Sequence, residues 1–227
     1  MLLDDLKSVL STHIDPEIKS DTSYRLASVL VVIYDQSPKI IMTEKPKSMK
    51  LHAGEISFPG GKLDVNDSNL LETALRETNE EIGLNISKDQ VVGQLRPVST
   101  LNSGFLILPF VSVLDQIPTL TSNSEVERIF HMPLDSLLKT ARKDTDQNHN
   151  LIDEMYTFEY REQIVWGASA RILKQIESKL ELWDSFKKSS SCLNIYGSTQ
   201  VLTKKNSFVK KDKTSISSTS LDNSKNK

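Results

Sequence analysis

Apolar residues recur along the chain at two spacings, one typical of helices and the other of strands. Leucines and a valine at helical spacing predict a short amphipathic helix over residues 2–13, which Pro16 ends. Two extended runs, 25–34 and 39–45, flank the polar turn 35–38 and predict a β-hairpin. Further strands are predicted at 55–58, 91–101, 105–114, 126–131 and 153–160.

Three more helices complete the predicted elements. The segment 70–82 has the clearest helical period, and Gly83 follows it where a C-terminal cap is expected. A small helix is predicted over 133–142 and a closing helix over 167–183. A strand-rich middle with one central and one terminal helix predicts either an α+β fold or a layered α/β/α sandwich.

The composition changes beyond Phe186. Residues 187–227 contain nine lysines, two acidic residues and ten serines, which is a net charge of +7. Because the whole chain carries −2, the first 186 residues carry −9. The last segment has too few apolar residues to offset the entropy of ordering it. The sequence therefore predicts one domain over 1–186 and a basic, Ser/Lys-rich disordered tail over 187–227.

Several classes of protein and partner are excluded by simple features. The longest apolar run, 27–34, is far shorter than the roughly 20 residues of a membrane helix, so no transmembrane segment is expected, and no membrane partner is predicted for the domain. No nucleic-acid partner is predicted for the domain, whereas the tail's lysines could hold RNA, an acidic membrane or no ligand. The acidic N-terminus is unlike a secretory signal peptide or a mitochondrial presequence, and no SKL-type signal for the peroxisome is evident at the C-terminus, so a cytoplasmic location is expected. Nothing in the sequence indicates the oligomeric state.

The predicted helix 70–82 carries a cluster of negative charge. At about 100° per residue, Glu77, Glu80 and Glu81 share one face. Like charges at i, i+4 destabilise a helix by roughly 0.2–0.5 kcal/mol, so a bound divalent cation explains the cluster most simply. Carboxylates are the ligands that Mg²⁺ or Mn²⁺ prefers. A solvated acidic face is the alternative, and the Pro-Gly-Gly bend at 59–61 favours the metal because glycine lets backbone groups approach an ion.

The segment around this helix resembles the Nudix hydrolase box. That pattern runs G, five residues, E, seven residues, then R-E-U-x-E-E-x-G-U with U apolar. Gly61 and the segment RETNEEIGL at 76–84 match its two ends. Gly61 and Arg76 stand fifteen positions apart rather than fourteen, Asp67 replaces the mid-box acid, and Thr78 takes an apolar position. The one-residue extension is similar to the coenzyme A pyrophosphatase branch of the family.

A second motif resembles the signature of that branch, which runs L-L-T-x-R, S or A, three residues, R, three residues, G, three residues, F-P-G-G. Here IMTEK at 41–45, Pro46, Lys50, Gly54 and FPGG at 58–61 fall at its spacing. Both arginines are lysines in this chain, and a lysine lacks the planar fork that binds phosphate bidentately. With further similar segments downstream, the resemblance covers about residues 24–182.

The resemblance implies an α/β class fold, a Nudix-type α/β/α sandwich with a mixed sheet, and a diphosphatase activity. It implies that Glu77 and Glu81, with Gly61, hold Mg²⁺, for which Mn²⁺ could substitute. Glu80 would bind a further Mg²⁺ and serve as the base, and Arg76 would orient a glutamate through a bidentate contact. Glu125 and Glu127 lie where the strand 126–131 begins and are expected to face solvent, although an acid of this downstream loop is an alternative base. A water activated by the metal would attack one phosphorus of the diphosphate.

The implied substrate is a small nucleotide such as coenzyme A, which would yield 3',5'-ADP and 4'-phosphopantetheine. Lys45, Lys50, His52 and Lys62 are the candidates to contact its phosphates, although a surface role suits His52 equally well. Two alternatives stay open. The chain could be a Nudix hydrolase of ADP-ribose, a dinucleoside polyphosphate or capped RNA, or a Nudix module that binds nucleotide or RNA without hydrolysis.

Overall fold

The computed structural model describes residues 2–18, 24–48, 53–100, 103–145 and 155–197. By its internal contacts the chain divides into one unit over 1–187 and a second over 188–227. Every described strand belongs to the first unit. Of the predicted site residues, Lys50 and His52 lie outside the described residues.

The larger sheet contains eight strands and is mixed. Its longest pairing joins β1 (Arg25–Tyr34) and β7 (Phe105–Leu114), which run parallel along their whole lengths. The other pairings in this sheet are antiparallel. Its main strand order is β3-β2-β1-β7-β5. The remaining strands of this sheet are β2 (Lys39–Glu44), β3 (Ile56–Ser57), β4 (Gly60–Lys62), β5 (Val91–Gln94), β6 (Val98–Ser99) and β8 (Arg128–Pro133).

A smaller sheet and the helices complete the first unit. The smaller sheet has the order β11-β10-β9, with β9 (Arg142–Lys143), β10 (Tyr156–Tyr160) and β11 (Gln163–Val165). The helices are α1 (Leu3–Leu10), α2 (Leu70–Ile82), the 3-10 turn η1 (Lys88–Gln90), α3 (Leu134–Leu138) and α4 (Gly167–Gly197).

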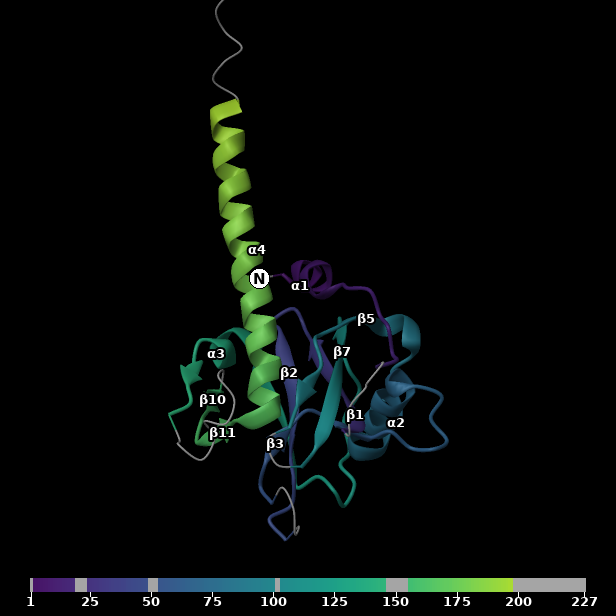
Figure 1. Cartoon of the computed structure of the whole chain (residues 1–227). Helices are drawn as coiled ribbons and strands as arrows, with labels where there is room; N and C mark the ends of the chain where they lie inside the picture. The colour runs from purple at the N-terminus through teal and green to yellow at the C-terminus, as the bar shows by residue number, and fades with distance from the viewer. Residues whose placement is uncertain (1, 19–23, 49–52, 101–102, 146–154, 198–227) are drawn as a thin grey trace, which may run out of the picture. The chain divides into compact units, whose positions relative to one another are not determined.

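Alternation of side chains along the strands divides the core into two layers. On one face of the sheet, Leu30, Val32 and Ile41 pack against the apolar side of α2. On the other face, Val31 and Met42 pack with buried residues of α1, α3 and α4. Figure 1 shows the sheet between α2 and α4. The predicted α/β/α sandwich is thus confirmed, and α2 is the element that carries the acidic cluster.

The predicted β-hairpin and the predicted strand 105–114 are present in the structure. Several boundaries differ from the prediction. The extended stretch 91–101 is two short strands, β5 and β6, and the helix predicted to end at Trp183 continues to Gly197. No Gly or Pro occurs between those two residues, so the helix can extend into the segment that composition marked as disordered.

The strand β4 is the element most relevant to function that the sequence pattern does not predict. Its sequence, Gly60-Gly61-Lys62, has no β propensity. It forms because β1 pairs with it, Ser28 opposite Gly61 and Val29 opposite Gly60. The amide of Leu30 also donates to the Pro59 carbonyl at 2.9 Å. Tertiary pairing therefore holds the glycine bend against the sheet and beside α2.

Across the described ranges, no helix is both long enough and apolar enough to cross a lipid bilayer.

Candidate functional site

Helix α2 is defined at both ends by side-chain and backbone caps. The side chain of Asn69 accepts a hydrogen bond from the Glu72 amide at 3.1 Å, and Gly83 closes the helix in the left-handed conformation with φ of 67°. The three glutamates then differ sharply in exposure. The side chain of Glu81 is 2% exposed, that of Glu77 19% and that of Glu80 51%. The cluster therefore runs from the protein interior out to solvent.

Glu81 lies between β2 and β4, where it binds one group from each side. The ammonium group of Lys45 contacts its Oε1 at 2.5 Å, and the amide of Gly60 donates to its Oε2 at 3.2 Å. Burial raises the pKa of the Glu81 carboxyl, and the Lys45 charge opposes that rise. The helix is thus attached to the glycine bend and to the end of β2 through one buried carboxylate.

Glu77 packs directly against the second glycine of the bend. A Cβ atom added to Gly61 would lie 2.3 Å from Oε1 and 2.4 Å from Cδ of Glu77. Only glycine leaves room for the carboxylate at that distance. Burial raises the pKa of the Glu77 carboxyl, and the neighbouring Arg76 guanidinium counteracts the rise. Both Glu77 and Glu81 therefore approach the same short bend.

Arg76 connects three carboxylates. It makes a bidentate pair with Asp67, with Nε to Oδ1 and Nη2 to Oδ2 both at 2.9 Å. Its Nη1 lies 3.0 Å from Glu77 Oε1 and 2.9 Å from Glu80 Oε2. The sequence suggested that Arg76 would hold a glutamate bidentately, whereas its bidentate partner is Asp67 and each glutamate contacts a single nitrogen. The Thr73 hydroxyl, which no sequence pattern singled out, also donates to Asp67 Oδ2 at 2.8 Å.

Asp67 gives the folded protein a pH dependence that can be measured. The Arg76 hydrogen bonds hold the pKa of Asp67 at about 2, below its ordinary value of 3.8. A lowered folded-state pKa stabilises the protein above the unfolded pKa, and that stabilisation is lost as the pH falls through the folded value. We expect Asp67→Asn to lose about 2 kcal/mol of unfolding free energy at neutral pH, with a smaller loss towards pH 2.

Urea denaturation between pH 2 and 7 measures this difference. Asp64→Asn is the matched control, because Asp64 lies in the same loop and its exposed carboxylate accepts hydrogen bonds from Asn66. A difference between wild type and Asp67→Asn that does not vary with pH would contradict the role of the Asp67–Arg76 pair.

The remaining predicted residues are two lysines and one loop acid near the glycine bend. Lys62 is exposed at the end of β4, and Lys45 lies 3.8 Å from Glu125 as well as against Glu81. Of the two loop acids that were alternative bases, Glu125 and Glu127, the structure therefore brings Glu125 to the same lysine that contacts the buried glutamate. Asp67 was noticed in the sequence only as a substitute for the mid-box acid, and its position nine residues before Arg76 gave no local signal of their pairing.

The acidic residues are of the type that binds a divalent cation, although their side chains are not gathered into a metal site. Within the described ranges, no three His, Cys, Asp or Glu side chains are gathered as a metal site. Instead Arg76 neutralises Glu77 and Glu80, and Lys45 neutralises Glu81. Carboxylate oxygens from two buried or partly buried glutamates beside a glycine bend are the donors that Mg²⁺ takes in proteins. The residue set therefore fits a hard cation.

A family profile and two similar curated proteins point to the same family. The family profile described as "NUDIX domain" matches residues 24–154. The "Uncharacterized Nudix hydrolase NudL" of Photorhabdus laumondii is 32% identical over 174 residues, which cover 74% of this chain and 90% of that protein. The protein of the same name from Yersinia enterocolitica is 32% identical over 166 residues, covering 72% of this chain and 85% of the relative.

A solved structure supports the same fold. The MutT/nudix family protein from Enterococcus faecalis superposes with a TM-score of 0.51 at 15% sequence identity. The match covers 74% of this chain and 65% of the other, just under two thirds of it. At that identity the likeness concerns the arrangement of helices and strands alone.

Proposed function

The chain belongs to the Nudix hydrolase family, whose members cleave diphosphate linkages with the help of divalent metals, and on that premise we propose that it hydrolyses coenzyme A or acyl-coenzyme A. The products would be 3',5'-ADP and 4'-phosphopantetheine, or its acyl form. The observation that supports hydrolysis is the approach of Glu77 and Glu81 to one glycine bend: a Cβ added to Gly61 would lie 2.3 Å from Glu77 Oε1, and the Gly60 amide donates to Glu81 Oε2 at 3.2 Å. The choice of coenzyme A rests on the motif at 41–61.

We assign the metal to Glu77, Glu80 and Glu81, with Gly61 beside them. Mg²⁺, or Mn²⁺ in its place, would lower the pKa of a bound water and offset the charge of the diphosphate. The buried Glu81 is held from two sides, so its oxygens keep one position. Arg76, which is fixed by its pair with Asp67, likewise holds the carboxylates of Glu77 and Glu80 in place.

The proton-accepting group is assigned to Glu80. Its side chain is half exposed, so water reaches it, and the contact with Arg76 Nη1 at 2.9 Å orients the carboxylate. Glu125, exposed and 3.8 Å from Lys45, is the second candidate for the same role. Both candidates lie within reach of a group that also contacts Glu77 or Glu81.

The phosphate contacts are assigned to Lys45, Lys50, His52 and Lys62. Lys45 is 17% exposed and lies against Glu81, so its ammonium group is next to the proposed metal ligands. Lys62 follows the glycine bend directly and extends from an exposed position. In this proposal residues 1–186 form the catalytic domain, and the basic segment 187–227 takes no part in hydrolysis.

Incubation of the purified chain with coenzyme A and Mg²⁺ tests the substrate. We expect 3',5'-ADP to be released, which ion-exchange chromatography detects. When EDTA removes the metal, this release should stop. ADP-ribose, a dinucleoside polyphosphate and capped RNA serve as competing substrates. Cleavage of one of these without cleavage of coenzyme A would overturn the substrate assignment and keep the enzyme class. Absence of turnover on all four, with nucleotide binding retained, would favour a Nudix module that binds without hydrolysis.

A further inference from the structure

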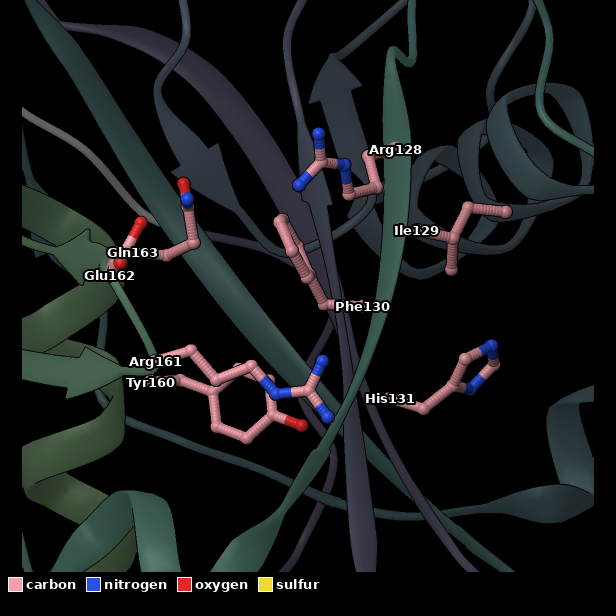
Figure 2. A pocket seen from close by; sticks show the side chains of 8 residues that line it. All are labelled: Arg128, Ile129, Phe130, His131, Tyr160, Arg161, Glu162 and Gln163. Carbon is pink, nitrogen blue, oxygen red and sulfur yellow. The ribbon is translucent and has the colours of Figure 1, made fainter.

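A pocket of about 590 Å³ lies between β8 and the hairpin of β10 and β11. It is lined by Arg128, Ile129, Phe130, His131, Tyr160, Arg161, Glu162 and Gln163. Figure 2 shows that Arg128 and Phe130 extend from β8 towards the hairpin, while Ile129 and His131 extend from the other side of the strand. The volume is within the usual range of about 300–1,000 Å³ for small-molecule sites.

Each arginine of the pocket lies over an aromatic ring. The guanidinium carbon of Arg128 is 5.5 Å from the centre of the Phe130 ring, and that of Arg161 is 5.1 Å from the centre of the Tyr160 ring. In Figure 2 the Phe130 ring lies between the two guanidinium groups. The pocket therefore combines two delocalised cations with the partly exposed ring of Tyr160, whereas Phe130 is a buried residue at its base.

Positive charge in the pocket is only partly compensated. Among the described residues, no carboxylate lies within ion-pair distance of Arg161. Arg128 is 59% exposed, and its Nε lies 3.7 Å from Glu44 Oε2, a buried oxygen that accepts no hydrogen bond from the described residues. Glu162 lies at the rim, and Figure 2 shows its carboxylate away from both guanidinium groups. The charge of Arg161 is therefore uncompensated among the described residues, and that of Arg128 is offset by Glu44 alone.

The backbone at Arg161 has an unusual conformation. Arg161 is the first residue of the two-residue turn that joins Tyr160 to Gln163, and its φ is 53°. Glycine adopts such angles without a steric penalty and is the ordinary choice in a two-residue hairpin. A long cationic side chain at this position has no evident value for the turn itself, whereas it supplies a guanidinium group to the pocket.

We propose that this pocket binds a nucleotide, with the phosphate on Arg128 and Arg161 and the base on the Tyr160 ring. Guanidinium groups bind phosphate oxygens in pairs and also stack on planar rings, so both halves of a nucleotide find matching surfaces. Arg128 and Phe130 belong to the face of the sheet that carries α4, because Phe130 packs in that core layer. The lining also includes Ile129 of the opposite face, and it contains none of the proposed metal ligands on α2.

The pocket is nevertheless close to the proposed catalytic residues along β2. Arg128 pairs with Glu44 in the β2–β8 register, and the next residue, Lys45, contacts Glu81. The bound nucleotide can be one of two things: the nucleoside end of a bound substrate, or a separate nucleotide that modulates the enzyme. The chemistry recognised is the same in both cases, and kinetics distinguish them.

Calorimetric titration with AMP in buffer containing EDTA tests the site without any metal. We expect AMP to bind more tightly than adenosine or inorganic phosphate alone, since each of these meets only half of the pocket. Arg161→Gly should weaken AMP binding about tenfold or more, because it removes charge-assisted hydrogen bonds. Glycine suits the φ of 53°, so the turn should keep its conformation.

Two further variants make the titration specific. Arg142→Gln is the matched control, because Arg142 is exposed on β9 of the same small sheet and lies outside the pocket lining. Arg161→Asn tests the same position with a second residue that tolerates left-handed backbone. Equal AMP affinity in wild type, Arg161→Gly and Arg142→Gln would overturn the proposal. So would AMP-induced amide shifts confined to residues outside 128–131 and 160–163.

The kinetic arm identifies the source of the nucleotide once a substrate is in hand. If the pocket holds the nucleoside end of the substrate, Arg161→Gly raises KM and leaves kcat close to wild type. If it holds a separate nucleotide, both constants stay unchanged in the absence of AMP, and the effect of added AMP on the rate disappears in the variant. The metal-free titration does not depend on hydrolysis, so it stands even where coenzyme A proves not to be cleaved.

Discussion

Replacement of Glu81 by glutamine is expected to lower turnover by about a thousandfold or more, because the proposed metal loses its most deeply buried charged ligand. The side chain is 2% exposed and meets Lys45 at 2.5 Å and the Gly60 amide at 3.2 Å. Glutamine has nearly the same shape, and its carbonyl oxygen can still accept from Gly60. The substitution therefore removes the negative charge and retains the packing.

Stability should change much less than turnover in Glu81→Gln. A buried carboxylate carries a desolvation cost that a neutral amide avoids, so loss of the ion pair with Lys45 is partly offset. Thermal unfolding followed by circular dichroism checks this point. Glu72→Gln is the matched control, because Glu72 is on the same helix and pairs with Lys88 away from the glycine bend. Wild-type turnover in Glu81→Gln, or an equal loss in Glu72→Gln, would show that the metal assignment is wrong.

Substitution of Gly60 by alanine is expected to destabilise the fold by about 3 kcal/mol or more. The added Cβ would lie 2.3 Å from the Ser28 carbonyl oxygen and 2.6 Å from the Val29 Cα. Both atoms belong to the backbone of β1, which is paired on its other edge with β7 and cannot move aside. The φ of +155° at Gly60 adds backbone strain for any other residue.

Gly104→Ala separates the clash at Gly60 from the general effect of a positive φ. Gly104 has φ of +65°, and an added Cβ there would meet no atom within 4 Å. Its substitution should therefore cost only the left-handed penalty of roughly 1–2 kcal/mol. Urea denaturation of the two variants measures the difference. Equal losses of unfolding free energy would mean that the approach of β4 to β1 is not a tight constraint.

The helix that carries the acidic cluster was predictable in full. Its apolar period set the limits 70–82, and Gly83 set its end, because both signals are local and require no knowledge of the rest of the chain. The same local signals placed β1, β7 and the hairpin to β2. The three glutamates followed from their spacing on that helix, since 3.6 residues per turn bring positions 77, 80 and 81 onto one face.

Pairings between distant segments were not predictable in the same way. β4 has no strand signal and exists because β1 pairs with it, and β9 and β11 are short strands formed against β10. Arg76 was placed beside the glutamates by sequence, yet the choice of Asp67 as its bidentate partner depends on how the loop before α2 folds back. The pocket at β8 likewise joins residues thirty positions apart in the chain.

By itself the sequence determined the acidic face of α2 and the resemblance to the family, because periodicity, caps and motif spacing act over a few residues. The α/β/α layering followed from that resemblance, since the pattern of elements left an α+β fold open. The tertiary structure alone decided which of those acids is buried, with Glu81 held by Lys45 and the Gly60 amide and Glu80 left half in solvent. It also decided that Arg128 and Arg161 share a pocket. Burial and long-range pairing arise when the sheet closes, and no local pattern records which surfaces then meet.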